Sequence, residues 1–438
     1  MSAGQATATG ADPIAASPAY PRGSRVNDAG HLEIGGCDAI ELAREFGTPA
    51  YVYAPDDIRA RAREFSEGLS SRGVDGEVLF ASKAAPITAI YSLVREEGLS
   101  VDVASGGELH GALNAGFDPA RIYMHGNNKS AAELRAAFES EVGTIVLDSL
   151  DEIALSDSLL DRSQPVLIRL TPGIKPSTHS YVQTGQLDSK FGFGIADGQA
   201  QRAVDAVEAS QHLELAGFHA HIGSQIFELE PYVAAIEAMA AFAAPMRPKV
   251  MNVGGGLGIS YGEGEEPPSI DEYVGVKVEA VRRLFGDEPR ILLEPGRSLV
   301  GNAGVTLYTV GTVKEVPGVR TYVAVDGGMS DNLRPMLYDA HYEALIADRA
   351  AAPAESRVTL AGKHCESGDV LIEEAQLADP RPGDILATPA TGAYGYSMAN
   401  NYNGVPRPPV IFCSGGDARV VVRRETYDDL TARDVTDG

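Results

Sequence analysis

Lys83 is the first residue whose type and place in the sequence could do chemistry. It directly follows residues 78–82, a mostly apolar run that predicts a buried strand. A lysine at the end of such a strand can be partly desolvated, and desolvation favours the neutral amine that forms a Schiff base. Taken alone, Lys83 is at least as well explained as a solvated loop residue. It is therefore a candidate nucleophile that needs support from other residues.

A run of glycines follows another predicted strand, at Gly254, Gly255 and Gly256. Glycine lets backbone N–H groups approach an anion closely, and the N-terminus of a following helix would add positive charge. Arg297, after the next predicted strand, could bind the same phosphate. A tight turn that merely needs glycine is the alternative. The nearness of Glu294 and Arg297 in the chain favours a phosphate site.

Glu294 ends a predicted strand, where a buried carboxylate is costly without a partner. A pyridinium nitrogen would be such a partner, and the carboxylate would keep the ring protonated as an electron sink. An ion pair with Arg297 explains Glu294 about equally well. His221 could stack on a flat ring, although a lone histidine near a core is more often structural.

The elements that must position these residues alternate between strand and helix from about residue 78 to 297. This alternation predicts parallel βαβ units, and eight of them predict a closed (β/α)8 barrel, with a doubly wound open sheet as the alternative. In such a barrel, functional residues lie at the C-terminal ends of the strands. The predicted strands are 78–82, 101–105, 122–125, 144–148, 166–170, 217–221, 250–253 and 291–294.

The pattern changes after Arg297, where further predicted strands have few helices between them. It predicts a second, mostly antiparallel β domain, with a helix at 340–348, and the segment 47–53 could join its sheet. The predicted organisation is a flexible tail at 1–25, strands of the β domain at 26–54, the barrel at 55–298 and the β domain at 299–438. The predicted strands after the barrel are 305–313, 320–325, 357–361, 370–372, 384–388, 409–412 and 420–423.

Composition limits the kinds of partner and compartment. The 438 residues carry a formal net charge of -25, which disfavours nucleic acid and anionic lipid, and no run approaches the length of a membrane span. The three cysteines, Cys37, Cys365 and Cys413, lack the close spacing of a zinc site and fit a reducing cytoplasm. We expect no metal, and we expect a cytoplasmic protein.

The ordered set of motifs resembles the fold-type III pyridoxal-phosphate (PLP) decarboxylases, the family of ornithine, arginine and diaminopimelate decarboxylases. The likeness runs from about residue 47 to 409. The matching segments are FASKA (80–84), DVAS (102–105), HIGSQ (221–225), GGGLG (254–258), EPGR (294–297), CESGD (365–369) and GAY (392–394).

The resemblance implies a PLP enzyme with a defined set of roles. Lys83 would bind PLP as a Schiff base, His221 would stack on the ring, and Glu294 would pair with the pyridine nitrogen. Tyr394 would reach the cofactor, and Cys365 would protonate the substrate's α-carbon. The family works as a head-to-tail homodimer, with Cys365 entering the partner's active site. The phosphate would be held by Ser224, Gly254, Gly255, Gly256, Gly296 and Arg297.

Further motifs favour the diaminopimelate branch of the family, which converts meso-2,6-diaminopimelate to L-lysine and CO2. They are DGGMSDNLRP (326–335), LYDA (337–340), SM (397–398) and NYN (401–403). By this resemblance, Arg297, Arg334 and Tyr338 would bind the far carboxylate of the substrate. Glu366 would bind the far amine, and Tyr394 would also contact the substrate. For Arg334, a surface ion pair is the alternative.

The chain also departs from the expected pattern, and other functions compete. Residues 362–364 before Cys365 are more polar than expected, 394–397 are mildly atypical, and the loop 175–186, with His179 and Tyr181, could reshape the pocket. The alternatives are a decarboxylase of another or modified diamino acid, a non-catalytic PLP-binding relative, and a PLP-free Schiff-base aldolase. An alanine-racemase-like enzyme is disfavoured by Glu294, because that group resembles this chain but has arginine near the pyridine nitrogen.

Overall fold

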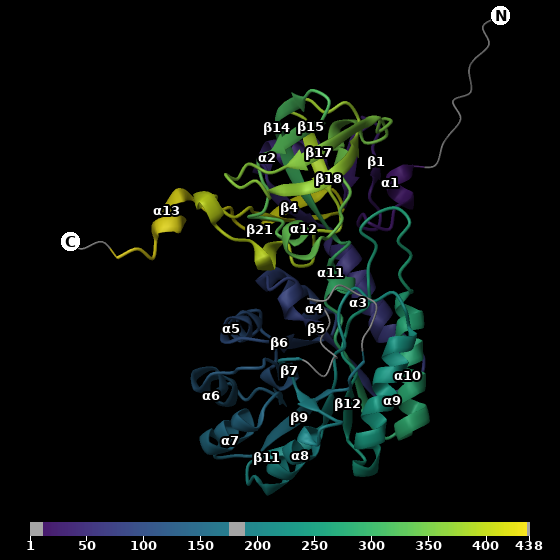
Figure 1. Ribbon diagram of the computed structural model, residues 1–438, viewed down its shortest axis with the longest axis vertical. Coiled ribbons are helices and arrows are strands. Elements are labelled where there is room, and N and C mark those ends of the chain that lie inside the picture. The colour runs from purple at the N-terminus through teal and green to yellow at the C-terminus, as the bar shows by residue number, and fades with distance from the viewer. Residues whose placement is uncertain (1–11, 175–188, 436–438) are drawn as a thin grey trace, which may run out of the picture. The chain divides into compact units, whose positions relative to one another are not determined.

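The computed structural model describes residues 12–174 and 189–435, and in it the chain forms two compact units (Figure 1). The barrel unit comprises Asp57–Ile259 and Glu265–Gly301. The β unit comprises Met1–Asp56, Ser260–Gly264 and Asn302–Gly438. Within the described residues, no helix is both long and apolar enough to cross a membrane.

Eight parallel strands close into a barrel in the order β5-β6-β7-β8-β9-β11-β12-β13, and β13 pairs with β5 to complete the ring. This closure confirms the predicted (β/α)8 barrel and excludes the open sheet. A two-residue strand, β10 (Phe193–Gly194), pairs in parallel with the end of β9 and was not predicted. The barrel strands are β5 (Gly76–Ala81), β6 (Ser100–Val103), β7 (Ile122–Met124), β8 (Thr144–Leu147), β9 (Gln164–Thr171), β11 (Leu213–His219), β12 (Val250–Asn252) and β13 (Arg290–Leu293).

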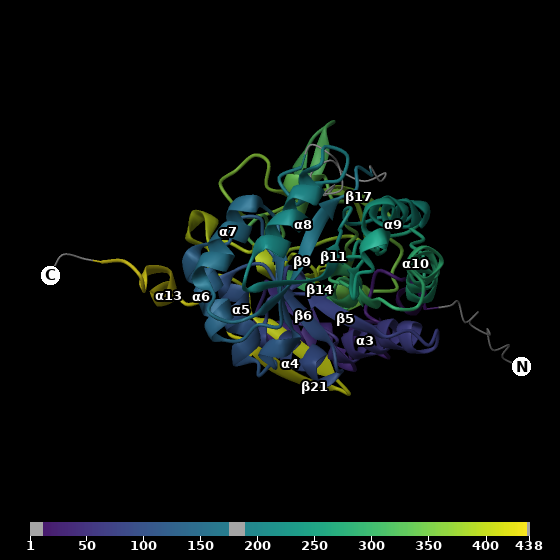
Figure 2. The ribbon, with the colours of Figure 1, turned by 90° about the horizontal axis from the view of Figure 1, so that it is seen from below.

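Helices surround the strands of the barrel unit, as the end-on view in Figure 2 shows. Many of these helices begin at a serine whose hydroxyl accepts a hydrogen bond from the first turn, and Ser130 and Ser269 form full capping boxes with Glu133 and Glu272. The helices are α3 (Pro55–Ser70), α4 (Thr88–Glu96), α5 (Gly106–Asn114), α6 (Ala131–Glu139), α7 (Leu150–Leu159), α8 (Gln199–Ala209), α9 (Glu230–Ala243), α10 (Ile270–Phe285) and the short α11 (Arg297–Val300).

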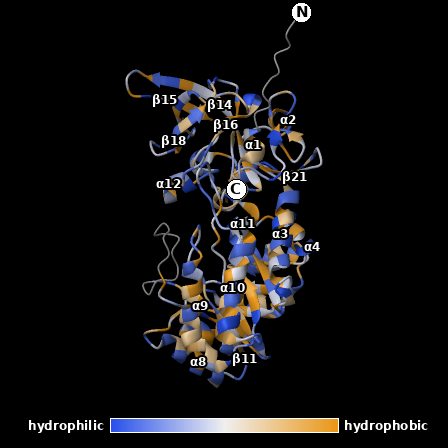
Figure 3. Ribbon diagram, turned by 90° about the vertical axis from the view of Figure 1, so that its right-hand side faces the viewer, coloured by the Kyte–Doolittle hydropathy of each residue, from blue (hydrophilic) through white to orange (hydrophobic). Residues whose placement is uncertain are grey.

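Several of the longer helices, including α8 and α10, are amphipathic, with one face buried. In α10 the buried positions recur every three or four residues, at Tyr273, Val274, Lys277, Val278 and Val281. Hydrophobic and hydrophilic residues alternate around α8 and α10 in Figure 3. Lys277 is the exception in this apolar stripe, because it is a charged residue in a buried position.

The β unit is built on a sheet in the order β18-β17-β15-β14-β4-β20-β21. Most neighbours are antiparallel, as predicted, with parallel pairs at β15–β17 and β4–β20. The segment 47–53 does join this sheet, as β4, between β14 and β20. The strands are β4 (Ala50–Tyr53), β14 (Gly304–Val316), β15 (Arg320–Val325), β17 (Ser356–Ala361), β18 (Val370–Leu377), β19 (Ile385–Thr388), β20 (Val410–Ser414) and β21 (Asp417–Val422).

The helix predicted at 340–348 is wrong. A short helix, α12 (Arg334–Tyr338), forms earlier and ends at Asp339, which has a left-handed backbone with φ 50°. The chain then extends, and β16 (Leu345–Ile346) pairs antiparallel with β19. Buried pairing with a distant strand has overridden the local helix propensity.

The described part of the N-terminal segment packs against the β unit. From residue 12 onward, the predicted tail contains α1 (Pro13–Ala16), and it buries Ile14, Ala19 and Tyr20 in the same core as Val52 and Ile411. Burial of these side chains favours a fixed position for residues 12–25. The predicted domain boundaries stay predictions.

Candidate active site

Lys83 lies in a single 3-10 turn, η1 (Ser82–Ala84), directly after β5. The position of the turn is fixed by Ser82, which is fully buried and whose Oγ donates a hydrogen bond to Glu108 Oε2 at 2.5 Å. The Lys83 side chain itself is exposed, as in the alternative of a solvated loop residue. The reason is that the turn carries Lys83 past the end of the strand, out of the apolar interior.

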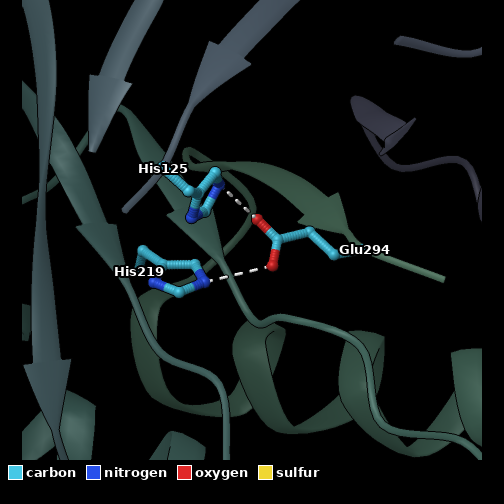
Figure 4. A group of neighbouring side chains, drawn as sticks. All are labelled: His125, His219 and Glu294. Atoms are coloured by element: carbon cyan, nitrogen blue, oxygen red, sulfur yellow. Dashed lines mark hydrogen bonds and ion pairs between the residues drawn. The ribbon is translucent and has the colours of Figure 1, made fainter. Parts of the chain in front are cut away.

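Glu294 follows β13 and lies within a cluster of buried polar groups (Figure 4). Its Oε1 is 3.0 Å from His125 Nε2, and its Oε2 is 3.1 Å from His219 Nε2. Asn252 Nδ2 also donates to Oε1 at 2.6 Å. These contacts replace the ion pair with Arg297 that the sequence had left as an alternative.

The protonation states in this cluster follow from burial and hydrogen bonding. Burial alone would raise the pKa of Glu294, but His219 and His125 hold the pKa of this carboxyl well below its usual value. Burial lowers the pKa of His219 to about 4. At neutral pH the cluster therefore contains an ionised carboxylate beside a neutral imidazole that can donate Nε2–H to it.

His125, His219 and Glu294 also have the spacing of a metal site, since their ligand atoms lie within 4.8 Å of one another. Two imidazoles and a carboxylate would suit a divalent transition metal. The same carboxylate is equally suited to a protonated ring nitrogen. The glycine loop after β12 (Gly254, Gly255 and Gly256) favours the ring nitrogen over a metal.

The three glycines after β12 leave no room for side chains. A Cβ atom on Gly254 would lie 2.5 Å from Ala220 O, and one on Gly256 would lie 2.6 Å from Gly223 O. A Cβ on Gly255 would overlap Glu294 O. Glycine is therefore required here, and the backbone can approach a ligand closely.

Arg297 and Ser224 converge beside this loop. Arg297 is 5% exposed, and its Nε and Nη2 lie 3.1 and 3.0 Å from Ser224 Oγ. Gly296 allows close packing, since a Cβ there would lie 2.9 Å from Ala81 Cβ. A guanidinium, a hydroxyl and backbone N–H groups together make a site for a phosphate.

His221 lies just past β11 and contacts the same loop. Its Nδ1 accepts a hydrogen bond from the Gly255 N–H at 3.3 Å. Burial lowers the pKa of His221 well below its usual value, and the nearby Lys83 charge adds to this effect. A neutral ring at this position is suited to stacking on a flat ligand.

Asn252 and Asp102 are among the residues of the barrel site for which the sequence predicted no role. Asn252 is fully buried, donates to Glu294 and accepts from the Gly254 N–H at 3.0 Å, so it links the carboxylate to the glycine loop. Burial raises the pKa of Asp102, in β6, to about 7, and the Glu294 charge adds to this effect. A polar residue inside an apolar strand is the sequence signal that could have identified both.

The predicted substrate residues of the β unit gather around Arg334. It is 5% exposed, and its Nη1 donates to Tyr261 Oη at 2.6 Å and Tyr342 Oη at 2.7 Å. Its guanidinium lies 6.0 Å from the ring centres of both Tyr338 and Tyr394. Arg334 is thus buried among phenols, which rules out the alternative of a surface ion pair.

Cys365 and Glu366 are exposed on a loop of the β unit, and hydrogen bonds to the buried Asp369 carboxylate fix this loop. Asp369 accepts hydrogen bonds from the Met329 and His364 backbone N–H groups at 2.7 and 2.8 Å. It also bonds His364 Nδ1 at 2.8 Å. The unexpected polarity before Cys365 is explained by this buried His364–Asp369 pair.

The predicted site residues therefore form two groups, one in each unit. The barrel unit brings together Glu294, the glycines, Arg297, Ser224 and His221, with Lys83 on the neighbouring strand end. The β unit brings together Arg334, Tyr338 and Tyr394, and it carries Cys365 and Glu366. The loop 175–186, with His179 and Tyr181, lies outside the described residues.

Comparison with known proteins identifies relatives over nearly the whole chain. A family model described as "Pyridoxal-dependent decarboxylase, pyridoxal binding domain" matches residues 55–301. The diaminopimelate decarboxylase of Bacillus subtilis (strain 168) is 52% identical over 425 residues, covering 94% of this chain and 97% of that protein. That of Halalkalibacterium halodurans is 48% identical, with the same coverage.

A solved structure agrees with these relatives. The crystal structure of diaminopimelate decarboxylase from M. jannaschii in complex with L-lysine has a TM-score of 0.89 and 32% sequence identity, covering 94% of this chain and 98% of that one. Its similarity extends over both units of the fold. The chain therefore belongs to the fold-type III family of pyridoxal-dependent decarboxylases.

Proposed function

We propose that this chain is an enzyme that decarboxylates meso-2,6-diaminopimelate to L-lysine and CO2, because its full-length relatives are diaminopimelate decarboxylases. The observation that carries the proposal is the ionised Glu294 carboxylate, held by His125, His219 and Asn252 next to the glycine–arginine phosphate site. The barrel site would supply the chemistry, and the β unit would supply the specificity.

The residues of the barrel unit fit PLP. A pyridinium N–H needs a buried acceptor that remains ionised, which is Glu294. A phosphate needs converging donors and close backbone approach, which Gly254, Gly255, Gly256, Gly296, Ser224 and Arg297 provide. An aldehyde needs an amine, and Lys83 is exposed directly after β5. When bound, PLP withdraws electrons from the substrate's α-carbon, so that the bond to the carboxylate can break.

The chain's own groups then have separate tasks. Lys83 would hold the cofactor covalently, Glu294 would retain the proton on the ring nitrogen, and His221 would orient the ring. CO2 leaves, and the α-carbon needs a proton in its place. Cys365 would deliver it from Sγ, and Tyr394 would contact the cofactor and substrate.

Specificity would come from charge complementarity. Arg334 has phenols but no carboxylate around it among the described residues, so its charge is available to the far carboxylate of the substrate. Tyr338 and Arg297 would share this anion, and Glu366 would bind the far amine. An ornithine-like substrate lacks that carboxylate.

We also propose that two copies form a cytoplasmic homodimer with shared active sites, in which Cys365 serves the partner's barrel. A free cysteine is usually buried, yet Cys365 is exposed, which supports a role at an interface. The other two cysteines, Cys37 and Cys413, are buried and hydrogen-bonded to each other as free thiols, which is consistent with a reducing compartment.

Product analysis tests the function. Purified protein with PLP is incubated in parallel with meso-diaminopimelate, lysine, ornithine and arginine, and CO2 and amine products are measured. Lysine from meso-diaminopimelate alone is the expected result. Turnover of ornithine but not of diaminopimelate would contradict the proposed substrate. A bound chromophore without any turnover would instead favour a modified diamino acid as substrate.

A further inference from the structure

Lys277 is a buried lysine that the mechanism above does not use. It lies in the middle of α10 and is 1% exposed. Its Nζ donates to three successive backbone carbonyl oxygens, those of Val253 at 2.7 Å, Gly254 at 3.0 Å and Gly255 at 3.4 Å. These carbonyls belong to the glycine loop itself.

Two tyrosines complete the surroundings of Nζ. Tyr273 Oη accepts a hydrogen bond from Nζ at 2.6 Å and donates one to Gly254 O at 3.3 Å. The Tyr273 and Tyr232 ring centres lie 4.3 and 4.6 Å from Nζ. Four oxygens and two ring faces thus surround one amine, and an ammonium group offers three N–H donors to them.

The direction of the carbonyls fixes the direction of the loop's N–H groups. In a planar trans peptide the C=O and the following N–H point in opposite directions. The carbonyls of Val253, Gly254 and Gly255 point at Lys277, so the N–H groups of Gly254, Gly255 and Gly256 point away from it. The Gly254 and Gly255 N–H groups donate to Asn252 Oδ1 and His221 Nδ1, so the Gly256 N–H is the one expected to face the phosphate.

The ammonium would also make those N–H groups better donors. A peptide whose carbonyl accepts a strong hydrogen bond is polarised, which strengthens the bond that its N–H can donate. An apolar side chain at position 277 would fill the space but leave three buried carbonyls without this donor. Burial lowers the pKa of Lys277 well below its usual value, and the Glu294 charge only partly opposes this shift.

We propose that Lys277 is a positioning residue that orients and polarises the glycine loop for the phosphate monoester of the cofactor. The proposal rests on the proposed function, because it assumes that the loop binds the phosphate of PLP. It acts through the backbone, since Lys277 lies on the far side of the loop from the predicted ligand.

The test compares two cofactor forms that differ only in the phosphate. Apoprotein of wild type and of Lys277→Met is titrated with PLP and with pyridoxal, and binding is followed by the visible absorbance of the bound cofactor. Lys277→Met should weaken PLP binding by about tenfold to a hundredfold, the range expected for lost hydrogen bonds to a charged group. Pyridoxal binding should stay within about twofold of wild type, because pyridoxal has no phosphate for the loop to bind.

Lys129→Met is the matched control. Among the described residues, Lys129 is a second buried lysine with carbonyl partners, Gly126 O and Val146 O. It also pairs with the buried Glu152 carboxylate at 2.5 Å, and within the described part of the chain no contact joins it to the glycine loop. The Lys129→Met variant should have the same ratio of PLP affinity to pyridoxal affinity as wild type. An equal loss of both ligands in Lys277→Met, or no loss of either, would overturn the proposal.

A second variant keeps the test decisive if Lys277→Met does not fold. Tyr273→Phe removes the hydroxyl that bridges Nζ and Gly254 O, and it should reduce PLP affinity in the same selective way by a smaller factor. Unchanged selectivity in Tyr273→Phe would then count against the proposal. Failure of the proposed function looks different, because wild type itself would not bind PLP.

Discussion

The polar residues at the ends of the barrel strands are held in definite protonation states by their burial and partners. Glu294 stays ionised because imidazole and amide N–H groups surround it. Asp102, a short distance along the ring of strands, is pushed the other way, since its pKa is raised to about 7 by burial and by the Glu294 charge. Carboxylates of one site thus differ in charge near neutral pH.

Asp102 should make the apoprotein less stable as pH rises. Its pKa is raised from 3.8 to about 7 on folding, so the folded state binds this proton more tightly. The resulting stability is fully present below about pH 4 and is lost as pH rises through about 7. Asp102→Asn should therefore stabilise the protein more at pH 8 than at pH 5. The gain in unfolding free energy over wild type should differ between the two pH values by at least about 1 kcal/mol, and Tm should shift accordingly.

Thermal unfolding of both proteins at the two pH values is the measurement. Asp205→Asn, at an exposed position of α8, is the control and should show the same small difference at both pH values. If Asp102→Asn shifted Tm equally at pH 5 and pH 8, the assigned titration would be wrong.

Arg334 should determine the choice of substrate and not the binding of the cofactor. Arg334→Met removes the buried guanidinium but keeps an unbranched apolar chain among Tyr261, Tyr338 and Tyr342. We expect KM for meso-diaminopimelate to rise by about tenfold to a hundredfold, since a charge-assisted contact is lost. PLP affinity should be unchanged.

Steady-state kinetics and a PLP titration measure the two effects separately. Arg320→Met, at an exposed residue of β15, serves as the control for loss of a positive charge in the same unit. A fall in PLP affinity that matches the rise in KM would argue against a substrate role for Arg334.

At the scale of elements, the sequence predicted best where strands are buried on both faces. Parallel barrel strands appear as short apolar runs ended by a polar residue, so all eight were found, and the strand-end residues Lys83, Glu294 and Arg297 came with them. The two-residue strands β10 and β16 have no such pattern, and the helix at 340–348 was predicted because pairing with β19 is invisible locally.

The same reasoning explains which site residues were missed. Lys277 occupies a mid-helix position where a lysine normally belongs to a solvated face, and only the packing of α10 shows that its Nζ reaches the glycine loop. Asn252 was hidden in an apolar strand of three residues. Roles that depend on contacts between separate elements cannot be found from local spacing.

The glycine loop makes a prediction about a single methyl group. In Gly255→Ala the new Cβ would overlap Glu294 O, so β12 and β13 must separate or the loop must move. We expect a loss of about 3 kcal/mol of unfolding free energy and a parallel loss of PLP affinity. Denaturant unfolding of the apoprotein and a PLP titration measure both.

Gly107→Ala is the matched control, since a Cβ in this first turn of α5 would meet only Ser105 Oγ, at 3.8 Å. It should be neutral or slightly stabilising. Gly255→Ala with wild-type stability would mean that the loop is free to relax.

At the scale of the whole molecule, the proposed shared sites predict complementation between inactive proteins. Lys83→Ala would lack the cofactor-binding amine in its barrel, and Cys365→Ala would lack the proton donor that it gives to its partner. After random exchange of subunits, half of the dimers are mixed and each mixed dimer has one intact site. Activity should recover to about a quarter of the wild-type value.

The specific activity of the mixture, compared with each variant alone, is the measurement. Mixing Lys83→Ala with Glu294→Gln is the control and should recover nothing, because both changes lie in the barrel unit. A mixture of Lys83→Ala and Cys365→Ala that is no more active than its components would contradict shared sites.

The position of β4 in the sheet has a consequence for how the protein is made. Val52 pairs with Val305 on one side and with Ile411 on the other, so β4 is synthesised before the barrel and its two partner strands only after it. The barrel lies between β4 and β14 in the chain, so it can close before β4 is paired. Until β14 emerges, β4 presents two unpaired edges, and until β20 emerges it still presents one. A nascent chain at that stage is the form most exposed to aggregation and most in need of a chaperone.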